Sequence, residues 1–260
     1  MEVHAHTHTP RKKWTHYFWE FLMLFLAVFC GFLAENQREH IVEGHRAKDY
    51  AKSLLNDLKE DTAELTGGIR QNAFMNLAFD SCIAIGMKNT EQSLIPGTFY
   101  YYSRFANNAY AIDWNTSTLT QLLQSGNLRY FKNKELITKI SKYYYLQGLI
   151  SKNNETDLLQ RNQLVEIRNR LLSAKNYKVF AQLDIEEEMK SLTSNDLIRD
   201  LMSQEIPYNA GSDRMMETFL NTIIDRRDRN KRFVEKLYPR AFMAATELIA
   251  LLKKEFHLKD

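Results

Sequence analysis

The feature that most constrains this chain is an apolar run near its N-terminus, YFWEFLMLFLAVFCGFLA at residues 17–34. Glu20 is the only charged residue within the run. A helix that crosses a hydrocarbon core of about 30 Å needs about 20 mostly apolar residues, because each residue advances about 1.5 Å. With Trp14 and Thr15 at the interface, residues 14–35 are long enough for a transmembrane helix. The sequence therefore predicts a protein anchored in a lipid bilayer.

A cleaved secretory signal peptide is the alternative for this run, since the basic residues RKK at 11–13 precede it. Cleavage requires small residues at positions −3 and −1, and a cut after Ala34 would place the bulky Phe32 at −3. Lipidation of Cys30 would need a small residue directly before it, where Phe29 stands. These positions favour an anchor that is retained.

The charges that flank the run indicate its orientation. Three basic residues lie just before it, at 11–13, whereas only Arg38 lies close after it. The positive-inside rule then predicts a cytoplasmic tail at residues 1–13 and an exported, periplasmic domain at residues 36–260. We expect the chain to lie in a bacterial inner membrane.

Composition predicts a mainly helical domain after the anchor. The whole chain has only nine glycines and four prolines, so few residues interrupt helices. The apolar stretch at 241–252 is short and contains Glu247, which fits a soluble core helix better than a second span. We therefore expect a single-pass, all-α protein: a transmembrane helix that runs into a long juxtamembrane helix, followed by a helical bundle.

Hydrophobic periodicity places the individual helices. The juxtamembrane helix is expected to stop at Gly67-Gly68, and residues 176–183 are expected to be irregular or weakly extended. Further helices are predicted, with approximate bounds, at 69–87, 116–124, from 133 onward, 157–174, 194–204, 214–238, and from Pro239 to the end.

The sequence contains no clear catalytic or metal-binding pattern. No GxSxG, HExxH, Walker A, GxGxxG or CxxC motif is present, which predicts that the protein is not an enzyme and has no cofactor. The net charge of +3 is distributed along the chain, which argues against nucleic-acid binding. The acidic run at 186–188 is expected to be a solvated face, the DRRDRNKR stretch at 225–232 to form internal ion pairs, and Cys82 to be a small buried residue.

One loop offers a candidate binding corner, in the segment SGNLRYFKN at 125–133. Gly126 suits a backbone with positive φ, and Asn127 can bond to a neighbouring turn. A structural corner is the simpler interpretation. The alternative is a surface site in which Arg129, Lys132 and Asn133 join Asn127 as exposed contacts for a partner.

Glu20 is an acidic residue in the predicted transmembrane helix, and a membrane anchor does not require one. An ionised carboxylate in hydrocarbon is costly, so intramembrane acids usually pair, face water or stay neutral. His16 lies one turn earlier on the same helical face and can pair with it. An interfacial location explains Glu20 most simply; contacts between helices in an oligomer and proton handling remain the functional alternatives.

Three segments together resemble a known family. They are the anchor with its early acidic residue followed by FLAENQREH, the segment DYAKSLLNDLKEDT at 49–62, and STLTQLLQSGNLRYFKNKELITKISKYY at 117–144. The chain resembles a family of uncharacterised single-span membrane proteins from Bacteroidota, with an N-terminal anchor and a helical domain. Here Trp19 stands where that family usually has glycine. The resemblance implies topology and no activity.

Two functional hypotheses follow. The first is a membrane-anchored, non-enzymatic scaffold, sensor or partner-binding protein, with a protein partner or a homo-oligomer in which Glu20 and His16 support helix association. The second is a single-span subunit of a proton-driven membrane complex, in which Glu20 couples to a multi-span partner.

Overall fold

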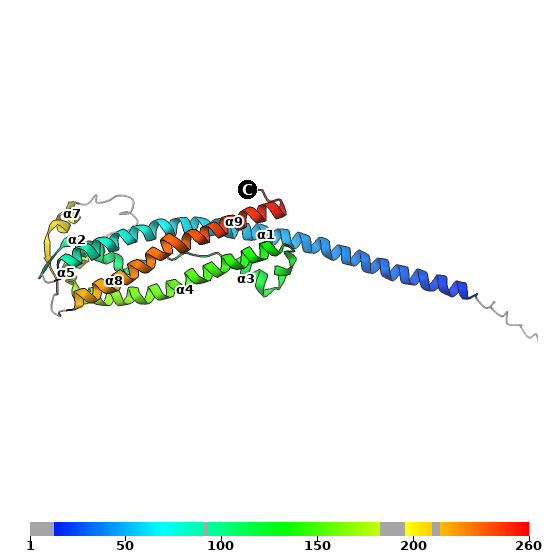
Figure 1. The fold of residues 1–260 in the computed structure, drawn as a ribbon, viewed down its shortest axis with the longest axis horizontal. Helices are drawn as coiled ribbons and strands as arrows, with labels where there is room; N and C mark the ends of the chain where they lie inside the picture. The colour runs from blue at the N-terminus through cyan, green and yellow to red at the C-terminus, as the bar shows by residue number, and fades with distance from the viewer. Residues whose placement is uncertain (1–12, 91–92, 183–195, 210–213, 260) are drawn as a thin grey trace, which may run out of the picture. The chain divides into compact units, whose positions relative to one another are not determined.

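The computed structural model describes residues 13–90, 93–182, 196–209 and 214–259, and these are almost entirely helical (Figure 1). The all-α prediction is confirmed. The first helix, α1, spans Trp14–Lys88. The chain divides into two compact units, Met1–Ala51 and Lys52–Asp260, and the boundary between them falls inside α1.

In the first unit, α1 exposes almost all of its apolar side chains. Trp14 is 80% exposed and Phe32 is 69% exposed. Phe21, Phe25 and Phe29 stack at successive turns, with ring centroids 6.2 and 5.9 Å apart. Within the described residues, α1 is the one helix whose length and composition suit a membrane crossing, with a window of mean hydropathy 2.0 and no buried residue. A signal sequence shares these properties.

The predicted helix end at Gly67-Gly68 is wrong, because α1 continues through both glycines to Lys88. The segment expected as a separate helix at 69–87 is therefore the last part of α1. A β-carbon on Gly68 would lie 2.2 Å from Cδ1 of Ile112. The glycine thus permits close packing of a neighbouring segment, and packing outweighs its cost of about 1 kcal/mol in a helix interior.

The second unit is built around the C-terminal half of α1 and three further long helices. α4 spans Lys134–Leu171 and packs against α8, Met215–Arg232, and α9, Tyr238–Phe256 (Figure 1). A separate helix beginning at 157 was predicted, but α4 runs through this position without a break.

A π-helical turn at Phe233–Leu237 joins α8 to α9, and Pro239 lies in the first turn of α9. A proline within a helix removes a backbone hydrogen bond, which is consistent with a wider turn just before it.

Shorter elements complete the unit. They are α2 (Gly97–Ser103), η1 (Arg104–Asn107), α3 (Ser117–Gln124), η2 (Asn127–Tyr130), α5 (Ala174–Ala181) and α7 (Asp196–Ser203). Of these, α2, α5 and α7 lie at one end of the bundle and α3 at the other (Figure 1). The strands β1 (Leu94–Pro96) and β2 (Glu205–Pro207) pair antiparallel, with Ile95 opposite Ile206. The prediction of irregular structure over 176–183 is wrong for α5, because the fully buried Phe180 fixes it as a helix against the core.

The core of this unit includes two apolar clusters of described residues. One joins α1, α4 and α9 with the segment that follows η1, through Leu65, Leu146, Ala241 and Ile112. The other lies where α1, α2, α4, α5 and α8 meet, and it includes Phe79, Phe99, Leu164, Phe180 and Phe219. Cys82 is completely buried there, as predicted, and burial raises the pKa of its thiol, so it is inert.

A buried carboxylate also connects α1 to α4. Asp61 is only 1% exposed, and its Oδ2 accepts hydrogen bonds from the Tyr143 hydroxyl at 2.5 Å and from Nε2 of Gln147 at 2.8 Å. Its Oδ1 accepts one from the backbone N–H of Asn115 at 2.8 Å. Burial raises the pKa of Asp61 above its ordinary value, and these donors oppose that rise.

Candidate functional site

The predicted membrane pair lies together on one face of α1. Nδ1 of His16 is 3.6 Å from Oε1 of Glu20, one turn further along, and both side chains are half exposed. The pairing geometry agrees with the prediction. Whether the two residues support association or proton transfer stays a prediction.

One residue of the predicted binding corner, Asn133, makes structural contacts, and the turn at Gly126 has the expected backbone. Gly126 has a φ of 67°, the left-handed conformation that its position was expected to need. Oδ1 of Asn133 accepts hydrogen bonds from the backbone N–H groups of Glu135 and Leu136 at the start of α4, and its Nδ2 donates to Glu255 on α9 at 3.0 Å. Asn133 therefore caps a helix and ties it to α9.

The other members of the corner lie at its surface. Arg129 places its guanidinium 5.4 Å from the ring centre of Tyr130, and Lys132 is exposed. Asn127 begins η2 and is partly exposed. The structure brings these residues together on one loop. A partner-binding role for them stays a prediction.

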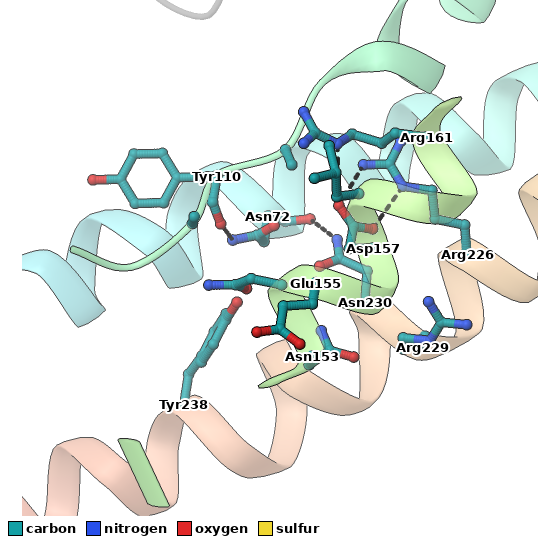
Figure 2. A pocket seen from close by; sticks show the side chains of 14 residues that line it. Asn72, Tyr110, Asn153, Glu155, Asp157, Arg161, Arg226, Arg229, Asn230 and Tyr238 are labelled. Carbon is teal, nitrogen blue, oxygen red and sulfur yellow. Dashed lines mark hydrogen bonds and ion pairs between the residues drawn. The ribbon is translucent and has the colours of Figure 1, made fainter. Parts of the chain in front are cut away.

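A polar cavity of about 280 Å³ lies elsewhere in the second unit, between α1, α4, α8 and α9 (Figure 2). Many of its lining residues carry amides, guanidinium groups or phenols, although carbon atoms make up most of the surface that they expose to the cavity. The lining residues are Asn72, Ala109, Tyr110, Ala111, Asn153, Asn154, Glu155, Asp157, Leu158, Arg161, Arg226, Arg229, Asn230 and Tyr238. Sequence reasoning did not identify this site.

Arg226 and Asp157 form the ion pair at one wall of the cavity. The Arg226 side chain is 2% exposed, and its Nε donates to Oδ1 of Asp157 at 2.8 Å while Nη2 donates to Oδ2 at 3.1 Å. The same guanidinium donates to the backbone carbonyls of Ala106 and Asn108. Burial lowers the pKa of Arg226, and Asp157 opposes that shift. The ion pair and these bonds therefore hold η1 and the start of the loop after it against α4 and α8.

An amide network fixes a second wall. Nδ2 of Asn72 donates to the backbone carbonyl of Gly68 at 2.9 Å and to that of Tyr110 at 3.1 Å. Nδ2 of Asn230 in turn donates to the carbonyl of Asn72 at 3.0 Å (Figure 2). It also donates to Oδ1 of Asn76 at 2.9 Å. These bonds hold α1, the loop and α8 in fixed positions around the cavity.

Several other lining side chains form no hydrogen bond or ion pair within the described structure. The side chains of Asn153, Asn154 and Glu155 make no hydrogen bond or ion pair with any residue that the structure describes. Tyr238 is 2% exposed, yet its hydroxyl has no hydrogen-bonding partner among the described residues and points toward the cavity (Figure 2). Burial raises the pKa of Tyr238 to about 12, so this hydroxyl is a neutral donor at physiological pH.

Arg229 adds a charge that the site does not neutralise. It lines the cavity, and no described carboxylate lies within ion-pair distance of its guanidinium. Its Nη1 is buried without a hydrogen-bond acceptor in the described structure. The three guanidinium groups in the lining face two carboxylates, those of Asp157 and Glu155, which leaves one positive charge in excess.

The sequence carries weak signals for this site. The stretch at 225–232 was expected to form internal ion pairs, and Arg227 does pair with Asp228 at 2.6 Å and with Asp80 on α1. Arg226 and Arg229, however, line the cavity, and neither forms an ion pair with an aspartate of this stretch in the described structure. Adjacent asparagines at 153 and 154 are poor residues for the middle of a helix, and they mark the point where α4 faces the cavity.

Two expectations fall on residues that the structure does not describe, the acidic run at 186–188 and the basic residues at 11–12. Within the described residues, no group of three or more His, Cys, Asp or Glu side chains is arranged to hold a metal ion.

Comparison with known proteins identifies no relative. No protein-family model matches the chain, and neither a curated protein nor a solved structure shows significant similarity to it.

Proposed function

We propose that this chain is a single-span, non-enzymatic membrane sensor whose helical domain binds a small polar solute. The polar cavity is the observation that carries the proposal. Hydrogen bonds and an ion pair hold its walls, whereas the lining groups of Tyr238, Asn153 and Asn154 have donors and acceptors to spare. These groups have no protein partner in the described structure, and a ligand that replaces water in the cavity would complete their hydrogen bonds.

The exposed apolar segment of α1 supports anchoring. It offers a bilayer about 20 residues of apolar surface with no protein covering, and Phe32 disfavours cleavage after Ala34. The basic residues before it favour a cytoplasmic N-terminus in the bacterial inner membrane, and hence a periplasmic helical domain. Reporter fusions at both termini test this topology. A C-terminal fusion that is active only in the cytoplasm, or a mature chain that lacks residues 1–34, would contradict it.

A binding role is favoured over an enzymatic one by the chemistry of the lining. Among the described lining residues there is no His, Ser, Thr, Cys or Lys to act as nucleophile or general base near neutral pH. Asp157 is held in an ion pair, and the pKa of Tyr238 lies far above neutrality. Glu155 is the lining carboxylate without an ion pair in the described structure, and its side chain is exposed. The lining is therefore better suited to orient a solute by hydrogen bonds than to transform it.

A sensor is favoured over a passive scaffold because α1 lines the cavity with Asn72 and also carries the apolar segment. A solute that contacts this wall would act on the same continuous helix that enters the bilayer. Such a device needs differential binding to two arrangements of the helices, which a bound solute can supply.

The proposal is tested by blocking the cavity. The purified full-length protein in detergent is screened for thermal stabilisation by small polar solutes, and the screen is repeated with Ala111→Trp, whose indole would occupy cavity space. Ala63→Trp, at an exposed position on α1 outside the lining, is the control. We expect stabilisation by a ligand in the wild type and the control, and its loss in the blocked variant. Equal stabilisation of all three proteins would refute solute binding in this cavity.

The proton-driven subunit remains the second candidate, because Glu20 lies in an apolar segment beside a titratable partner, His16. Glu20→Gln tests it, with Glu35→Gln as the control, since Glu35 is exposed and pairs with Arg38 at 2.5 Å. Loss of co-purification with a multi-span protein in Glu20→Gln alone would favour this function. Unchanged oligomerisation and unchanged partner binding would remove both proposed roles of Glu20.

A further inference from the structure

We infer that the solute taken by this cavity is a small hydroxylated carboxylate, of the sugar-acid class. The inference rests on the proposed solute-binding function and adds the charge and the polar pattern of the ligand. Three features of the described lining lead to it: the unneutralised guanidinium, the free amides with the free phenol, and the size of the cavity.

The guanidinium of Arg229 selects for negative charge. Arg226 is neutralised by Asp157, and Arg161 shares that carboxylate, with its Nε 3.6 Å from Oδ2. Arg229 has no carboxylate of its own among the described residues. A partly buried cation without a counter-ion is unfavourable, and a ligand carboxylate would form charge-assisted hydrogen bonds with it.

The free amides select for hydroxyl groups. Asn153 and Asn154 each offer one amide acceptor and two donors, and Tyr238 adds a hydroxyl from the opposite side, on α9 (Figure 2). A ligand hydroxyl both donates and accepts, so it matches such a mixed set, whereas a purely apolar solute would leave these groups unpaired. The volume of about 280 Å³ is small for a ligand pocket and suits a compact solute.

Glu155 opposes an anion and therefore supplies a sharp test. Its side chain lines the cavity, is exposed, and makes no ion pair within the described structure. Removing its charge should strengthen the binding of a carboxylate, whereas removing the charge of Arg229 should weaken it. A neutral ligand would respond to neither change, and a cation would respond in the opposite sense.

Three six-carbon polyols that differ only at one end serve as probes: gluconate is anionic, sorbitol is neutral, and glucamine is cationic. Their binding to the full-length protein in detergent is measured by calorimetry. We expect gluconate to bind at least about tenfold more tightly than sorbitol, because a charge-assisted hydrogen bond adds more than 1 kcal/mol. Glucamine should bind least.

Variants locate the site. Arg229→Gln should reduce gluconate affinity about tenfold and leave sorbitol unchanged, and Glu155→Gln should raise gluconate affinity about threefold, as expected for an exposed charge. Tyr238→Phe should weaken both probes while its ring keeps its place in the core. Arg232→Gln, an exposed arginine on α8 outside the lining, is the matched control and should change nothing.

The outcomes separate this inference from the proposed function. Equal binding of gluconate and sorbitol at the cavity would overturn the ligand class and leave solute binding intact. Preference for glucamine would overturn it in favour of a cation. Gluconate binding that Arg229→Gln leaves unchanged would place the anion elsewhere and overturn the inference. If none of the probes binds, the inference falls, and the blocked-cavity screen with Ala111→Trp decides the proposed function by itself.

Discussion

Replacing Asp61 with alanine should destabilise the helical unit more than any substitution of a neighbouring acidic residue. Its carboxylate is 1% exposed and accepts three hydrogen bonds, from Tyr143, Gln147 and the backbone of Asn115. Asp61→Ala leaves all three donors without their acceptor, at the point where α1, α4 and the segment before α3 meet. The change therefore acts on contacts that join separate parts of the chain.

The magnitude follows from the buried donors. Each donor left unpaired costs about 1–3 kcal/mol, and water that enters the vacated space offsets part of this cost, so we expect a total of about 3–5 kcal/mol. In a unit of this size each kcal/mol shifts the melting temperature by about 2–4 °C, which predicts a decrease of about 10 °C. Asp61→Asn should cost only about 1 kcal/mol. Oε1 of Gln147 has no hydrogen-bond partner in the described structure, and it can accept from the introduced amide after the Gln147 amide flips.

The assay is thermal unfolding of the full-length protein in detergent, followed by circular dichroism at the helical band. Glu60→Ala is the control, since Glu60 is exposed and accepts one bond from Nδ2 of Asn115. It should change the stability by less than about 0.5 kcal/mol. If Asp61→Ala costs less than about 1 kcal/mol, or if the alanine and asparagine variants lose the same amount, the reasoning about unpaired donors is wrong.

Three further predictions concern pH, glycines and the buried arginine. Because burial raises the pKa of Asp61, the folded state binds its proton more tightly than the unfolded state. The part of the stability that depends on this proton is present at acidic pH and is lost as pH rises through the raised pKa, so Asp61→Asn should flatten that part of the stability–pH profile in denaturant titrations. Gly97→Ala would place a β-carbon 1.9 Å from the backbone oxygen of Leu201 and should lower the melting temperature. Gly148→Ala should instead raise the stability by about 0.5–1 kcal/mol, because no atom outside its own helical turn lies within 4 Å of the added β-carbon. Arg226→Lys cannot reproduce the forked contacts to its carboxylate partner and the two loop carbonyls, so it should cost about 3 kcal/mol in the same melts and weaken any solute binding.

Much of the helical architecture was predictable because it depends on local pattern. The scarcity of glycine and proline, together with the apolar repeats, indicated the all-α class, and the run at 17–34 indicated the exposed apolar helix. Helix ends were less predictable. From the local sequence, Gly67-Gly68 was predicted to end the helix. In the structure, Tyr110 and Ile112 pack against these glycines and α1 continues through them.

By itself, the sequence determined the helical class, the apolar segment with the Glu20–His16 spacing, and the left-handed turn at Gly126, because each depends on residues a few positions apart. Only the tertiary structure decided the cavity, because its lining comes from four helices and a loop spread over the second unit. Which arginine is neutralised was also decided there: Arg226 meets Asp157 across 69 residues of chain, whereas Arg229, one turn further on, meets no described carboxylate. Ion pairs between residues so far apart in the chain depend on how the helices pack, and the local hydrophobic periodicity does not predict them.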